Sequence, residues 1–303
     1  MLTPHDIHHG VILPAFLGLV LLLPALIPKL RSRAHIILLL ALTVPFLLSY
    51  MHLFDRPPLP PIEFMDWLFY LPIAAFPIAL IIDIFHGGGR ELTAEAQRRR
   101  ESETKHANFG LLALPLYFLS TILLLWPIFK NNDSFGESAT IISFIALASF
   151  LSYLSLSQLS PRIGGRSMQL ILLLLMAATS QLVFMSGTVT LGQRPLIFTA
   201  VLAGTLPVLW YLKIPVTRGP LLLIVLLWHG FLMIGHFGAN LTPLNALLLL
   251  IAPHLAWAAE LRPRDWPAPA RILLRFAAVL IAMLTAQFLG WRDFVEATRE
   301  MQF

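Results

Sequence analysis

Long apolar runs, each bounded by a short polar stretch, follow one another along the whole 303-residue chain. Membrane-spanning strands would alternate apolar and polar positions with period two, whereas these runs are continuous and rich in Leu and Ala. An α-helix needs roughly 20 such residues to cross a bilayer. The pattern therefore predicts ten transmembrane helices, at about 10–28, 35–54, 67–85, 109–129, 139–159, 167–186, 196–212, 220–237, 241–259 and 272–290.

The fold class that follows is all-α, a polytopic transmembrane bundle that forms a single membrane domain over 1–303. A composition of 57% hydrophobic and 12% charged residues supports this, since soluble domains hold about 25% charged residues. The longest polar connection, 86–107, opens with Gly87–Gly89 and contains the basic run Arg98–Arg100. That run is interpreted as a topology determinant that contacts lipid, with a docking site for a partner protein as the alternative.

Lys and Arg residues alternate in density from one connection to the next. Sixteen of the 21 fall in the first, third, fifth, seventh and ninth connections. Because basic connections stay in the cytoplasm, the chain is predicted to keep both termini outside it, in the cytoplasmic membrane of a bacterium. The formal charge of +5 then faces anionic lipid headgroups, which are the expected partner, and it is no sign of nucleic-acid binding.

Charged side chains are predicted to avoid the middle of every span. Asp83 and Glu260 stand near cytoplasmic helix ends, Arg275 is close enough to an end to extend toward the headgroups, and Arg194 falls in an outer connection. This pattern disfavours antiporters and proteases that work through buried carboxylates. Cysteine is absent, which excludes thiol catalysis and iron–sulfur ligation.

Histidine is the chemically versatile residue that does enter the predicted core. His229 lies near the middle of the eighth helix, His236 follows seven residues later on nearly the same face, and His254 lies in the ninth helix. Imidazoles at this depth are candidate ligands of a haem or a transition metal. The alternatives are hydrogen bonds to neighbouring helices or the lining of a polar pathway.

A second histidine group is predicted at the outer surface. It comprises His5, His8 and His9, which precede the first helix, together with His52, which ends the second. A helical start would place two of the first three imidazoles on one side. Zinc or copper accepts such ligands, so these four residues form a candidate metal site, although polar tails often carry histidines that bind nothing.

Polar residues also gather in the outer half of the sixth helix. Ser180 and Gln181 are expected to point into the bundle, because polar groups in hydrocarbon need partners. They are interpreted as interhelical contacts, with a hydrophilic cavity that opens outward as the alternative.

No motif that dictates a chemistry occurs along the chain, so the functional predictions stay broad. The first is a non-catalytic subunit or scaffold of a larger membrane complex, with redox complexes among the options and other membrane subunits as partners. The second is a facilitator or transporter of a small neutral or amphipathic solute. The third is a lipid-modifying membrane enzyme with His229 as a base.

Overall fold

The computed structural model is all-α and describes residues 3–85, 113–130, 135–187, 189–261 and 266–300. The connection 86–107, with its Arg98–Arg100 run, lies outside these residues. In chain order the elements are α1 (Pro4–Ile7), η1 (His8–Ile12), α2 (Leu13–Leu22), η2 (Leu23–Leu26), η3 (Pro28–Arg33), α3 (Ala34–Phe54), α4 (Phe64–Phe85), α6 (Ala113–Phe129), α7 (Phe135–Ile163), α8 (Gly165–Ser186), α9 (Val189–Leu212), α10 (Arg218–Gly238), α11 (Pro243–Ile251), η5 (Ala252–Ala259) and α12 (Ala268–Glu300).

These elements form ten apolar helical segments among the described residues, one for each predicted span. Eight are long and apolar enough to cross a membrane, and the segments Ala113–Phe129 and Pro243–Ala259 are shorter. Helices suit a bilayer because every backbone hydrogen bond is made within the segment. The protein is therefore a polytopic membrane protein, and its membrane helices contact lipid.

Each 3-10 segment among the described residues carries a proline in its first turn. The ninth segment is α-helical to Ile251 and continues as the 3-10 helix η5, in which Pro253 occupies the first turn. Pro24 has the same position in η2, which ends the first segment. A proline removes a backbone donor and its ring displaces the preceding turn, so the tighter 3-10 pattern takes over at these points.

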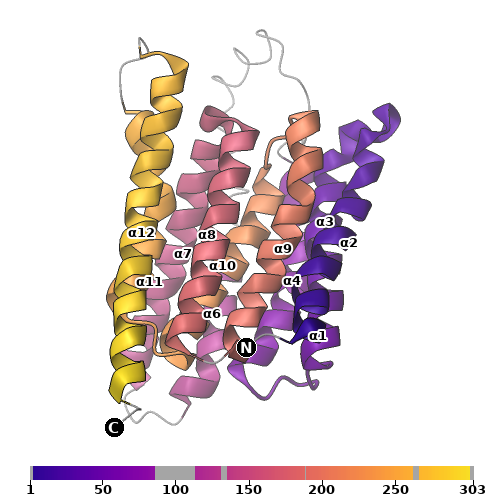
Figure 1. The fold of residues 1–303 in the computed structure, drawn as a ribbon. Helices are drawn as coiled ribbons and strands as arrows, with labels where there is room; N and C mark the ends of the chain where they lie inside the picture. The colour runs from indigo at the N-terminus through magenta and orange to yellow at the C-terminus, as the bar shows by residue number, and fades with distance from the viewer. Residues whose placement is uncertain (1–2, 86–112, 131–134, 188, 262–265, 301–303) are drawn as a thin grey trace.

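The innermost helix of the bundle is α10. Every residue from Gly219 to Gly235 is buried, as expected for a helix that is apolar on all sides and surrounded by others. Glycine allows α4 to come close, since a Cβ at Gly219 would lie 2.4 Å from the carbonyl oxygen of Ala79. By contrast, α2 and α12 stand at opposite edges of the bundle (Figure 1).

Both described chain ends lie at the same end of the bundle, as an even number of crossings requires (Figure 1). We call this the histidine end, because it carries His5, His8, His9, His52 and His236. The opposite end, called the basic end, carries Lys29, Arg31, Arg33, Arg162, Arg166, Lys213, Arg218 and Arg271. The charge asymmetry agrees with the pattern used for orientation, and the placement of the basic end in the cytoplasm stays a prediction.

Candidate functional site

A cavity in the described bundle lies between α7, α10 and α11, in the half nearer the histidine end. We call it the lateral pocket. Its volume is about 400 Å³, and it is lined by Ile141, Phe144, Ile145, Ala148, His229, Leu232, Met233, His236, Phe237, Pro243, Ala246, Leu247 and Leu250. Such a volume is within the range of small-molecule sites.

The mouth of the lateral pocket faces the lipid-exposed surface. Phe144 on α7 is 72% exposed and Leu247 on α11 is 49% exposed, although both also line the cavity. A molecule dissolved in the bilayer can therefore enter from the side, between these two helices. Among the described residues that line the pocket, the two histidines are the only ones with polar side chains.

Backbone carbonyls fix the tautomer of both histidines. The Nδ1–H of His229 donates to the carbonyl oxygen of Val225 at 2.8 Å, one turn earlier on α10. The Nδ1–H of His236 donates to the carbonyl oxygen of Leu241, also at 2.8 Å. Because a carbonyl only accepts, each Nδ1 carries the proton, and the Nε2 of a neutral ring keeps its lone pair.

His229 is the inner of the two and is only 4% exposed. Its Nε2 is buried and has no hydrogen-bond partner among the described residues. A buried polar atom without a partner costs free energy, so a hydrogen-bond donor that reached this nitrogen would be favoured. His236 is half-buried and lies nearer the membrane surface.

His254 has a different role. Its Nδ1 lies 3.0 Å from the hydroxyl of Ser155 and its Nε2 lies 3.1 Å from the hydroxyl of Ser152, both on α7. The indole of Trp257 donates to the same Ser155 hydroxyl at 3.0 Å. This cluster joins η5 to α7. Hydrogen bonding to a neighbouring helix was one of the alternatives that the sequence left open for the core histidines.

The three candidate cofactor ligands do not fit a haem with two histidine ligands. His229 and His236 lie on one face of one helix, so they cannot approach an iron atom from opposite sides. Both ring nitrogens of His254 are engaged by serines. The described lining of the lateral pocket also lacks Lys and Arg, which haem propionates favour.

The four histidines predicted to bind a metal do lie together at the histidine end. The ring of His9 is 4.4 Å from that of His5, 4.7 Å from that of His8 and 5.3 Å from that of His52, measured between centroids. The His9 and His52 rings are stacked. In the described part of the chain, no group of three or more His, Asp or Glu side chains is arranged to hold a metal ion. Metal binding here stays a prediction.

The polar face of the sixth segment is used for helix contact. The Ser180 hydroxyl donates to the carbonyl oxygen of Gly192 on α9 at 3.1 Å, while Thr179 and Ser186 donate to carbonyls of their own helix. Gln181, expected to point inward, is exposed instead. Neighbouring positions on a helix lie about 100° apart, so Ser180 faces the bundle whereas Gln181, the next residue, faces outward.

Two arginines are more buried than the sequence suggested. Arg194 belongs to α9 rather than to an outer connection, is 8% exposed, and donates to the Tyr50 hydroxyl at 3.1 Å. Its guanidinium also lies over the Phe54 ring. Arg275 is buried, and its guanidinium forms an ion pair with Glu260 at 2.7 Å.

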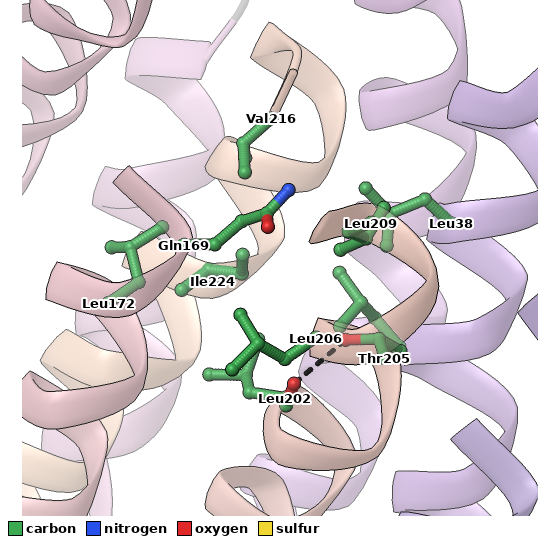
Figure 2. Close-up of a pocket in the computed structure, with 10 residues that line it drawn as sticks. Leu38, Gln169, Leu172, Leu202, Thr205, Leu206, Leu209, Val216 and Ile224 are labelled. Carbon is green, nitrogen blue, oxygen red and sulfur yellow. Dashed lines mark hydrogen bonds between the residues drawn. The ribbon is translucent and has the colours of Figure 1, made fainter. Parts of the chain in front are cut away.

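A second, much smaller cavity lies between α3, α8, α9 and α10 (Figure 2). Its volume is about 10 Å³, close to the space that one water molecule needs. Gln169 lines it and donates through Nε2 to the carbonyl oxygen of Ile214 at 2.9 Å. Arg31 and Ser160 similarly bond the carbonyls of Leu212 and Val216, so this cavity belongs to the network that fixes the α9–α10 connection.

Comparison with models of known protein families and with curated protein sequences gave no match to this chain. The functional argument therefore depends on the geometry of the lateral pocket.

Proposed function

We propose that this protein binds a lipophilic molecule from the bilayer in the lateral pocket, and that it does so as a non-catalytic subunit of a larger, redox-linked membrane complex. One observation carries the proposal. A cavity whose mouth lies at the lipid-exposed side chains of Phe144 and Leu247 is lined on its buried side by His229, and the Nε2 of this residue is buried without a hydrogen-bond partner among the described residues.

The chemistry of the lining supports binding over catalysis. Eleven of the thirteen described lining side chains are apolar, and the remaining two are imidazoles whose Nδ1–H groups donate to backbone carbonyls. Apolar walls with a few fixed polar groups are typical of ligand sites, where the polar groups set orientation. The described lining offers no carboxylate or hydroxyl to act beside the imidazoles, so a reaction of the ligand is assigned to partner subunits.

Photolabelling in lipid nanodiscs tests this proposal. The probe is an alkylphenol whose alkyl chain carries a diazirine, and the labelled peptides are identified by mass spectrometry. We expect labelling of α7 and α11 around the mouth, because the chain of the bound probe extends between these helices. An excess of unlabelled alkylphenol should abolish that labelling.

Two variants, each of which replaces an alanine by phenylalanine, supply the matched comparison. Ala246→Phe places a ring inside the lateral pocket, whereas Ala74→Phe places the same ring on the exposed side of α4. Labelling of α7 and α11 should fall at least tenfold in the first variant and stay unchanged in the second. If the wild type and both variants are labelled equally, and unlabelled alkylphenol does not reduce that labelling, the probe samples only the lipid-facing surface. The proposal would then be wrong.

A further inference from the structure

Arg194 is a buried cation near the histidine end, and it forms no ion pair with any described residue. We propose that its guanidinium and the first turn of α9 together bind a phosphate group at the membrane surface. The phosphate belongs to the headgroup of an anionic phospholipid or is a free phosphate ion, since both present the same oxygens. This site is separate from the lateral pocket and does not depend on the proposed function.

Every described contact of the Arg194 guanidinium is with a neutral group. Its Nε donates to the Tyr50 hydroxyl at 3.1 Å, and its Nη1 donates to the carbonyl oxygen of Thr190 at 3.0 Å. The central carbon of the guanidinium lies 4.2 Å from the centroid of the Phe54 ring and 5.6 Å from that of the Tyr50 ring. A charge that leaves water without an opposite charge beside it costs free energy, so an anion that reaches Arg194 is favoured.

The second buried arginine shows what Arg194 lacks. Arg275 is similarly enclosed, and it pairs with the carboxylate of Glu260 at 2.7 Å. Beside Arg194, the carboxylate of Asp66 in the first turn of α4 accepts hydrogen bonds from the two backbone N–H groups that precede this helix. It is therefore used at the start of α4 and forms no ion pair with Arg194. The described residues supply Arg275 with a counter-charge and leave Arg194 without one.

The free side of the Arg194 guanidinium is open to a ligand. Its Nη2 makes no hydrogen bond to a described residue, and it is not among the described polar atoms that are both enclosed and without a partner. The bond from Nη1 places the guanidinium beside the first turn of α9, where Val189 and Thr190 are exposed. A ligand oxygen can therefore approach Nη2 past the start of this helix.

The start of α9 supplies the second feature of a phosphate site. The first N–H groups of a helix have no partner within it, and the helix dipole is positive there. Helical side chains point back toward the amino terminus, so Arg194 adds its charge beside this end, one turn from Thr190. A guanidinium binds phosphate oxygens through two parallel N–H groups. Lipid phosphates lie at the level where transmembrane helices end, so this anion is present at the required depth.

The test measures the binding of two probes to the full chain in a mild non-ionic detergent. Dioleoyl-phosphatidylglycerol is counted by native mass spectrometry, and inorganic phosphate is followed by 31P NMR. Arg194→Gln removes the charge and should weaken binding at least tenfold, since a hydrogen bond to a charged group is worth this much or more. Arg292→Gln is the matched control and should change affinity less than twofold, because Arg292 is exposed on α12 and already bonded to Asp293.

A second pair of variants leaves Arg194 in place and answers the question even if Arg194→Gln fails to fold. Thr190→Glu puts a carboxylate on the exposed first turn of α9, where the helix dipole favours it and where it pairs with Arg194 four residues later. It should therefore exclude the phosphate and weaken binding at least tenfold. Thr190→Gln has the same length without the charge and should bind as the wild type does.

The two probes distinguish the sources of the phosphate. Tight binding of phosphatidylglycerol with little binding of inorganic phosphate would identify the lipid headgroup, and the reverse would identify the free ion. If neither probe binds to the wild type, or if both bind equally well to Arg194→Gln and Thr190→Glu, the proposal is wrong. Arg194 would then serve only to hold α9 against α3.

Discussion

The carboxylate of Asp83 on α4 holds the amino-terminal end of α10. It accepts a hydrogen bond from the Thr217 hydroxyl at 2.9 Å and another from the backbone N–H of Gly219 at 3.1 Å. The first N–H groups of a helix have no partner within that helix, and the helix dipole favours a negative charge beside them. Asp83 therefore fixes the start of the helix that carries both histidines of the lateral pocket.

Asp83→Ala should lower the stability of the protein by about 1–2 kcal/mol, as the loss of a helix cap does elsewhere. The measurement is thermal unfolding in a mild detergent, followed by circular dichroism. Asp293→Ala, which removes a carboxylate that is 36% exposed on α12, serves as the control and should have little effect. If both variants unfold at the same temperature as the wild type, Asp83 does not hold α10.

The ion pair between Arg275 and Glu260 ties α12 to the end of η5. It measures 2.7 Å, and the two side chains are only 7% and 14% exposed. Removal of one partner of a buried pair leaves an uncompensated charge, so Glu260→Leu should destabilise the protein by roughly 3–5 kcal/mol. The double variant Glu260→Leu with Arg275→Met should recover much of that loss. A double variant less stable than the single one would contradict this account.

His254 is predicted to matter for stability and not for ligand binding. His254→Leu leaves the hydroxyls of Ser152 and Ser155 without the imidazole, and we expect a loss of about 1–3 kcal/mol. Affinity for the alkylphenol should stay within twofold of the wild type, because His254 does not line the lateral pocket. A large fall in affinity in a variant that folds normally would place His254 in the binding site.

The orientation of the bundle can be tested with single cysteines, because the natural sequence contains none. Ser32 is exposed at the basic end and Glu63 is exposed at the histidine end. In intact cells of a bacterial host, a membrane-impermeant maleimide should label Glu63→Cys and spare Ser32→Cys, and permeabilised cells should show both. The reverse pattern would invert the orientation, and labelling of both in intact cells would contradict an odd number of crossings between them.

Hydropathy alone was sufficient to predict the ten helical segments, because a span must be continuously apolar wherever it packs. It also placed His229 and His236 on one face, since both lie on one regular helix. Arg194 was misplaced because the polar stretch before Pro195 resembled a connection, whereas α9 begins at Val189 and covers this arginine with the Tyr50 and Phe54 rings.

The lateral pocket could not be predicted, because it depends on which helix faces meet. Phe144 on α7 and Leu247 on α11 are about 100 residues apart in the chain, and a lipid-facing leucine has the same hydropathy as a core leucine. The sequence likewise gave no reason to separate His254, which Ser152 and Ser155 engage, from His229, whose Nε2 has no partner among the described residues. That distinction arises only when α7 and η5 are packed together.

The most direct test of the account is the 15N spectrum of the His229 ring in histidine-labelled protein, assigned by the signals that disappear in His229→Leu. The account predicts a neutral ring with a protonated Nδ1 and a bare Nε2. Addition of an alkylphenol should change the His229 ring resonances in the wild type, and it should leave them unchanged in Ala246→Phe, in which a ring fills the lateral pocket. A proton on Nε2 in the free protein, or His229 resonances that ignore the alkylphenol in the wild type, would contradict it.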